Sequence, residues 1–336
     1  MLSISKAEKS YIQAGLTASP PSRSDGRGLL DCRSVALETG VAPLANGSAR
    51  LSIAGATEVI AAAKLDVETV DDGTEGRDGG RLICTVSCSP SAYPNLSSST
   101  LDDLQADLTS LLHTTLTHPT LHPQNLGILP GKKSWLLSLD VLVLADGGNV
   151  LDALFLASRA ALWDTRVPRT RGVEYKARGR TAATATGGQG EGGRGDMDVD
   201  QEVQSGFDSR MIHRATDFEL PDYWDEGEVL EGRERWPVAV TLNLEPPIHF
   251  LDATSQEEAA SPLRLLLAFA FPQETPPVMQ AMRMLGPGEV VLTELKELIK
   301  AGENYARAMH AALNTKLREE EVRRNQRARE RFELHR

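Results

Sequence analysis

Five leucines recur at helical spacing near the middle of the chain and predict an amphipathic helix with Thr100 as its cap. The leucines of this apolar stripe are Leu101, Leu104, Leu108, Leu111 and Leu112. A strand is predicted next, over residues 134–146, and a Gly147–Gly148 turn follows it. The stretch from Val150 to Asp164 is almost uniformly apolar, which is typical of a helix buried in a core.

Runs of β-forming residues, bounded by turns that contain Gly, Asn or Pro, predict strands on both sides of this block. They fall at residues 32–43, 48–55, 57–67 and 81–89, and again at 237–247, 248–254 and 263–271. Residues 282–290 fit a strand or a turn. A short helix is predicted from Ser3 or Ser5 to Gly15, and a longer one begins at Thr293. This order of elements indicates a layered α/β or α+β fold with a repeated half.

Residues 178–206 differ from the rest of the chain in composition. They are rich in Gly, Thr, Ala, Asp and Gln and carry almost no large apolar residues. Such a segment cannot offset an ordering cost of about 1–2 kcal/mol per residue, so we predict a disordered insertion. The predicted organisation is therefore an N-terminal helix and linker (1–28), a first half (29–177), the insertion (178–206), a second half (207–290), and a C-terminal helix with a charged tail (291–336).

The charge balance limits the possible partners of the chain. Its 336 residues include 36 Lys and Arg against 47 Asp and Glu, which gives a formal net charge of -11. A general nucleic-acid binder is therefore disfavoured, because no surface-wide positive field can form. Any contact with RNA has to come from a local basic patch or from basic neighbours in an assembly.

Cysteine usage and the N-terminus indicate a soluble protein of a reducing compartment. Cys84 and Cys88 are spaced to lie on one face of a strand and are expected to be small buried side chains rather than metal ligands. Lys6, Glu8 and Lys9 interrupt the stretch that a signal peptide would need. No segment reaches the roughly 20 apolar residues of a membrane span.

Four segments of the chain carry a resemblance to a known family. They are the N-terminal SKAEKSYIQAGL with SDGRGLLDCR, the strands of residues 38–68, the strand, turn and helix of residues 134–169, and LDATSQEEA at residues 251–259. Together they resemble ribonuclease PH-fold proteins, in particular the ring subunits of the eukaryotic exosome. The resemblance implies a ribonuclease PH-like α+β fold (ribosomal protein S5 domain 2-like), with a βαβα arrangement and internal duplication. It also implies assembly into six-membered rings around a channel for single-stranded RNA.

The same resemblance implies that the phosphorolytic chemistry of active members is lost here. In those members a Thr-Arg pair after the Gly-Gly turn holds the attacking phosphate at a helix N-terminus. This chain has Asn149 and Val150 at that place, and Arg264 where a catalytic aspartate is expected. We therefore expect no catalytic residues and no cofactor.

Three acidic residues lie near the expected position of the family's aspartates: Asp252, Glu257 and Glu258. A solvated loop or helix start is the first interpretation of this trio. A vestigial magnesium site is the second.

RNA contact has four candidates, namely His113, Lys64, Arg264 and Arg283. Each has an ordinary alternative as a surface or interface side chain. Residues 127–134 do not have the spacing of a phosphate-binding P-loop, and residues 130–134 are expected to form a turn between a strand and its neighbour. The charged tail is expected to be a solvated helix, with docking on a partner or on RNA as the alternative.

Two functions remain in competition at this point. The first is a non-catalytic exosome ring subunit that helps thread single-stranded RNA for 3'-to-5' degradation and processing of ribosomal and other RNAs. Its expected partners are the other ribonuclease PH-like subunits of a hetero-hexameric ring, cap subunits with RNA-binding domains, a separate hydrolytic nuclease, and RNA. The second is a phosphorolytic 3'-5' exoribonuclease that contributes half of a composite site. The expected location is nucleus, nucleolus and cytoplasm.

Overall fold

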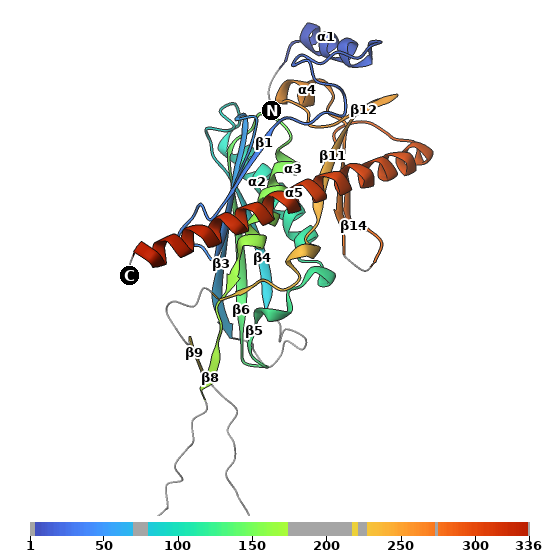
Figure 1. The fold of residues 1–336 in the computed structure, drawn as a ribbon. Helices are drawn as coiled ribbons and strands as arrows, with labels where there is room; N and C mark the ends of the chain where they lie inside the picture. Colours follow the sequence, from blue (N-terminus) through green and yellow to red (C-terminus); the bar gives the residue numbers. More distant parts are fainter. Residues whose placement is uncertain (1–3, 70–79, 174–216, 221–226, 273–274, 335–336) are drawn as a thin grey trace, which may run out of the picture.

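Two β-sheets with one buried helix between them form the body of the protein (Figure 1). The structure is a computed structural model and describes residues 4–69, 80–173, 217–220, 227–272 and 275–334. The predicted insertion at residues 178–206 lies outside these ranges. The larger sheet contains β1 (Val35–Thr39), β2 (Gly47–Ile53), β3 (Thr57–Thr69), β4 (Arg81–Cys88), β5 (Gly127–Leu129) and β6 (Lys133–Ala145).

Strand order in the larger sheet is β1-β2-β3-β6-β4, and β5 also pairs with β6. All neighbours are antiparallel except β4 and β6, which run parallel. A parallel pair needs a crossover, and the amphipathic helix α2 (Ser98–Leu116) supplies it and packs on β4. The side chain of Ser97 caps this helix by accepting from the backbone N–H of Thr100, so the predicted Thr100 cap was wrong by three residues.

The second sheet is antiparallel, with strand order β12-β11-β13-β14. Residues 282–290, which fitted a strand or a turn, lie in the strand up to Leu285. Two short pairs, β7 with β10 and β8 with β9, lie outside both main sheets. The strands are β7 (Arg166–Val167), β8 (Arg171–Val173), β9 (Asp217–Glu219), β10 (Glu228–Val229), β11 (Val238–Glu245), β12 (Ile248–Phe250), β13 (Arg264–Ala270) and β14 (Val278–Leu285).

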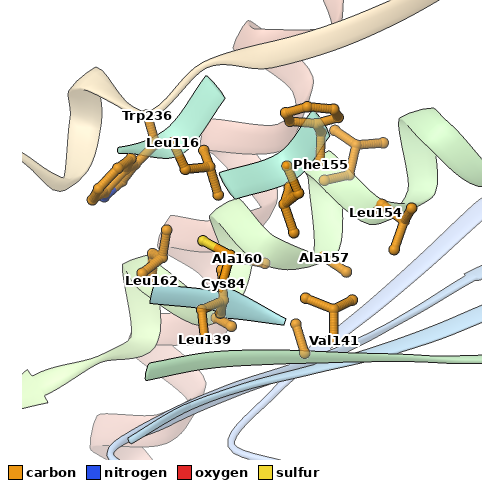
Figure 2. Packing of buried hydrophobic residues seen from close by; sticks show 14 of the residues in the cluster. Cys84, Leu116, Leu139, Val141, Leu154, Phe155, Ala157, Ala160, Leu162 and Trp236 are labelled. Carbon is orange, nitrogen blue, oxygen red and sulfur yellow. The ribbon is translucent and has the colours of Figure 1, made fainter. Parts of the chain in front are cut away.

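Helix α3 (Val150–Asp164) fills the space between the two sheets, as its uniform apolarity predicted. Every residue from Leu151 to Asp164 is buried. Ala157 and Ala160 face the larger sheet near Leu139 and Val141 (Figure 2). Such small side chains let the helix backbone approach the sheet closely, and close packing of this kind accounts for much of the stability of a core.

The remaining helices lie on the outside of the two sheets. Helix α1 (Lys6–Thr17) begins with a capping box between Ser5 and Glu8, which confirms the cap at Ser5. Helix α4 (Ser255–Ala260) is a short turn that contacts α1. Helix α5 (Leu292–Leu334) contains 43 residues, a length of about 65 Å, and it contacts β11 and β13 of one sheet, β1 of the other, and α3. Short 3-10 turns occur at Pro119–Leu121, Gln124–Leu126 and Arg233–Arg235.

Several smaller predictions can be compared directly with the structure. Cys84 and Cys88 are buried in β4 with free thiols, as expected. The P-loop-like segment forms the turn between β5 and β6. Within the described residues, no helix is both long enough and apolar enough to cross a membrane.

Candidate functional site

The Gly147–Gly148 turn brings the N-terminus of α3 against α4. Thr57 fixes this turn, because its hydroxyl donates to the carbonyl of Gly148 over 2.6 Å and accepts from the N–H of Gly147 over 3.0 Å. Gly148 has a φ of +96°, and a side chain there would collide with the carbonyl of Ala253. The turn therefore places the start of α3 directly beside the first residues of α4.

A carboxylate from α4 occupies the N-terminus of α3. The backbone N–H of Asn149 donates to Oε1 of Glu258 over 2.8 Å, and Nη1 of Arg264 lies 3.1 Å from Oε2. Burial raises the pKa of Glu258, while the positive charge of Arg264 acts in the opposite direction. The positive end of a helix dipole is a natural site for an anion such as phosphate. Here the chain itself supplies the anion and also its counter-charge.

Asp252 lies beside this helix terminus and is held by two arginines from the N-terminal segment. Its carboxylate accepts from Arg33 at 2.7 and 2.9 Å, from Arg27 at 2.9 Å, and from the side-chain amide of Asn149 at 3.1 Å. Burial alone would raise the pKa of Asp252, but the hydrogen bonds and charges of the two arginines outweigh it and lower the pKa. Asp252 therefore stays ionised, and both of its carboxylate oxygens accept hydrogen bonds.

Glu257 forms a fully buried ion pair with Arg23. The two hydrogen bonds between their side chains measure 2.7 and 2.9 Å, and the side chains are 0% and 2% exposed for Arg23 and Glu257. The same carboxylate accepts from the backbone N–H of Thr254 and so completes the cap of α4. This geometry fastens the segment before β1 to the start of α4.

The acidic trio is thus neutralised by four arginines of this chain: Arg23, Arg27, Arg33 and Arg264. The predicted solvated loop was wrong, because Asp252 and Glu257 are buried, although Glu257 and Glu258 do lie in the first turn of a helix. Among the residues that the structure describes, no group of three or more His, Cys, Asp or Glu side chains is arranged to hold a metal ion.

Comparison with known proteins gives the family of this fold and site. The sequence profile of the 3' exoribonuclease family, domain 1 (RNase PH), matches residues 31–168. A Dictyostelium discoideum protein named putative exosome complex exonuclease RRP42 is 30% identical over 220 residues, which are 52% of this chain and 67% of that protein. The chain belongs to the ribonuclease PH family. Saccharolobus solfataricus exosome complex component Rrp42 is 38% identical over 146 residues, 43% of this chain and 52% of that protein.

Solved structures of the same fold agree with this assignment. A chain of the Archaeoglobus fulgidus exosome, solved with RNA bound to the active site, has a TM-score of 0.63 at 20% identity and covers 91% of this chain and 97% of its own. Rice Rrp46 has a TM-score of 0.51 at 15% identity and covers 88% of this chain and 100% of its own. These similarities confirm the predicted ribonuclease PH-like α+β fold.

Two of the positions that were predicted to distinguish this ribonuclease PH-family chain from active members lie at the same helix start. Asn149 is buried in a left-handed backbone conformation, and Val150 is the first residue of α3. Because Val150 is apolar, the helix start lacks the guanidinium expected of active members. Arg264, the other predicted departure, is the residue that neutralises Glu258.

The structure does not bring the four RNA-contact candidates together. His113 joins α2 to the sheet, since its Nδ1 accepts from the backbone N–H of Cys84 at 3.3 Å. Lys64 is on β3 in an exposed ion pair, Arg283 is on β14 in another, and Arg264 is at the helix start. RNA contact by these residues stays a prediction.

Sequence reasoning missed the arginines of the N-terminal segment. Arg23, Arg27 and Arg33 fall within eleven residues of a turn-rich stretch, and each donates to Glu257 or Asp252. The signal that could have found them is the clustering of three guanidinium groups in and just before the first residues of a predicted strand. When such groups are buried, they need carboxylate or carbonyl partners from elsewhere in the chain.

Sequence reasoning also missed a buried carboxylate in the first turn of α3. Asp152 is 2% exposed and accepts a 2.7 Å hydrogen bond from the hydroxyl of Thr241 on β11. Burial raises its pKa to about 7, which the hydrogen bonds from Thr241 and Asn149 only partly oppose. The Oδ1 atom of Asn149 has no hydrogen-bond partner among the described residues. The site thus continues into the core as a chain of polar groups.

Proposed function

We propose that this chain is a non-catalytic subunit of an exosome ring. The relatives named as exosome components and the fold shared with archaeal exosome chains support ring membership. In this role the chain helps thread single-stranded RNA toward 3'-to-5' degradation and processing of ribosomal and other RNAs. Its partners are the other ribonuclease PH-like subunits of a hetero-hexameric ring, cap subunits with RNA-binding domains, and a separate hydrolytic nuclease.

One observation carries the proposal of inertness. The carboxylate of Glu258 accepts the N–H of Asn149 at the start of α3, and Arg264 neutralises that carboxylate. An approaching phosphate therefore finds the N–H of Asn149 held by a carboxylate and the guanidinium of Arg264 paired with the same carboxylate. Val150 supplies no further guanidinium at the helix start. Loss of one preorganised donor to a developing charge costs about 10²–10³ in rate, and here several are missing or engaged.

Ring membership is tested by reconstitution. The chain is co-expressed with the other ribonuclease PH-fold subunits encoded by the same genome, and the complex is weighed by native mass spectrometry. A stoichiometric six-subunit ring that contains one copy of this chain supports the proposal. A stable monomer, or a hexamer of this chain alone, contradicts it.

The inertness of the site is tested by phosphate titration. The chain is labelled with 15N-asparagine, and the amide resonance of Asn149 is followed as inorganic phosphate is added. The proposal predicts no saturable shift, because Glu258 already holds this N–H. A saturable shift in the wild-type chain contradicts the proposal and favours the composite phosphorolytic site.

The chain is proposed to act in the nucleus, the nucleolus and the cytoplasm, where ribosomal and messenger RNAs are processed and degraded. Fluorescent tagging with markers of each compartment tests this. Confinement to an organelle lumen contradicts it.

A further inference from the structure

Strand β14 exposes an unusual amount of apolar surface at the edge of its sheet. Four of its eight residues are large apolar side chains that are 40–46% exposed: Val278, Met279, Met282 and Met284. One side of β14 is hydrogen-bonded to β13, and the other side has no strand beside it within the described residues (Figure 1). An edge of this kind leaves a row of backbone donors and acceptors available for pairing.

The three methionines of β14 share one face of the sheet. In antiparallel strands, residues directly opposite each other point to the same face. Met279, Met282 and Met284 are opposite residues of β13 that pack in the core beneath α5, namely Phe269, Leu267 and Leu265. Helix α5 packs on β11 and β13. The methionines therefore continue the apolar face of the sheet outward.

The opposite face of β14 lies along α2, and that surface is acidic. Arg283 forms a 2.6 Å ion pair with Asp107, and Gln280 lies 3.4 Å from the hydroxyl of Thr120, just beyond the end of α2. Helix α2 contains no Lys or Arg, and its exposed charges are Asp102, Asp103 and Asp107. The single charge on β14 is thus neutralised within the chain, while the surface next to it remains negative.

We propose that β14 is a docking edge for an extended segment of a neighbouring ring subunit. The incoming strand pairs with the free edge of β14, places apolar side chains beside the methionines, and places Lys or Arg on the α2 side. Edge strands that stay in solvent are usually protected by charges, prolines or bulges that twist them away. β14 has no proline, and its one charge is engaged by Asp107. Its one register irregularity lies opposite Ala268 and Phe269, so Met282 and Met284 belong to the regularly paired part of the strand. The proposal rests on the proposed function and names the surface through which the chain joins the ring.

Charge excludes RNA as the occupant of this edge. Phosphates are held mainly by Lys and Arg, and binding weakens when the surrounding field is negative. The only guanidinium on β14 is paired with Asp107, and the neighbouring helix adds carboxylates without cations. A polypeptide with an alternating apolar and basic pattern satisfies both faces, and main-chain hydrogen bonds supply the affinity in strand addition.

The test is the double variant Met282→Glu/Met284→Glu in the reconstituted ring. Both side chains are exposed in the single chain, so the variant is expected to fold normally, and circular dichroism and thermal melting check this. The matched control is Val67→Glu, which replaces an apolar residue of β3 that is 47% exposed within the larger sheet. We expect assembly to weaken by on the order of 100-fold in the double variant and to stay unchanged in the control.

Each outcome separates this inference from the proposed function. A folded double variant that assembles as well as wild type overturns the docking edge and leaves ring membership intact. If the double variant assembles normally but its ring no longer retains RNA, the surface binds RNA, and this result also overturns the docking edge. If the wild-type chain forms a homodimer and the double variant does not, the edge binds a second copy of this chain, which contradicts the proposal. Failure of the wild-type chain itself to enter any ring contradicts the proposed function instead.

Discussion

Replacing Asp152 with Asn is expected to make the stability of the protein less dependent on pH. Asp152 lies in the core between α3 and β11, and its pKa is raised to about 7 from its ordinary value of 3.8. Burial is the main cause, the charge of Asp252 adds to it, and the hydrogen bonds from Thr241 and Asn149 oppose it. The folded chain therefore holds this proton more tightly than the unfolded chain does.

The sign and size of the effect follow from proton linkage. Below about pH 4 the carboxyl is protonated in both states and has no effect on the free energy of unfolding. Between about pH 4 and pH 7 the folded state binds more protons, so stability falls as the pH rises. A shift of roughly 3 pKa units corresponds to about 4 kcal/mol at 1.36 kcal/mol per unit, and this penalty is complete above about pH 7.

Asp152→Asn removes the charge and keeps an oxygen that can accept from Thr241. The variant is expected to gain little at pH 4.5 and up to about 4 kcal/mol at pH 8. Urea unfolding between these pH values measures the difference, with the exposed Asp66→Asn as control. A gain that is equal at both pH values, or a loss at pH 8, refutes the reasoning.

Two further predictions concern stability. Arg23→Met leaves Glu257 as an uncompensated buried carboxylate, so the free energy of unfolding in urea is expected to fall by about 3–5 kcal/mol. The control Arg50→Met removes an exposed ion pair and is expected to cost about 0–1 kcal/mol. Equal losses contradict the assigned role of the buried pair. Ser97→Ala removes the acceptor for the N–H of Thr100 and is expected to cost about 1 kcal/mol by thermal unfolding; an unchanged melting temperature argues against the cap.

Local pattern in the sequence predicted most of the fold. The leucine stripe of α2, the uniform apolarity of α3 and the alternation in β4 each report how one element is buried, and each element is found where it was expected. The exact cap of α2 was misplaced because Ser97 and Thr100 are both good capping residues. Sequence alone does not decide which of two such hydroxyls accepts the backbone N–H.

The candidate site was predicted only in part, because its contacts join distant segments. Asn149, Val150 and Arg264 were predicted to be departures from active relatives, and they meet at one helix start. The partners of the acidic residues were not identified. Arg23 pairs with Glu257, which is 234 residues away in the sequence, and Asp152 accepts a hydrogen bond from Thr241, which is 89 residues away. Tertiary packing brings these residues together, namely that of α3 on β11 and that of the N-terminal segment on α4, and no local pattern reports it.

The release of nucleoside diphosphates by the ring tests the central claim most directly. Rings that lack the hydrolytic nuclease are incubated with a single-stranded RNA and inorganic phosphate, with either wild-type chain or Glu258→Gln. If Glu258 only fills the helix start and pairs with Arg264, both rings release nucleoside diphosphates at the same rate, whether that rate is zero or belongs to another subunit. Phosphate-dependent release by the wild-type ring that disappears in an intact Glu258→Gln ring contradicts the account.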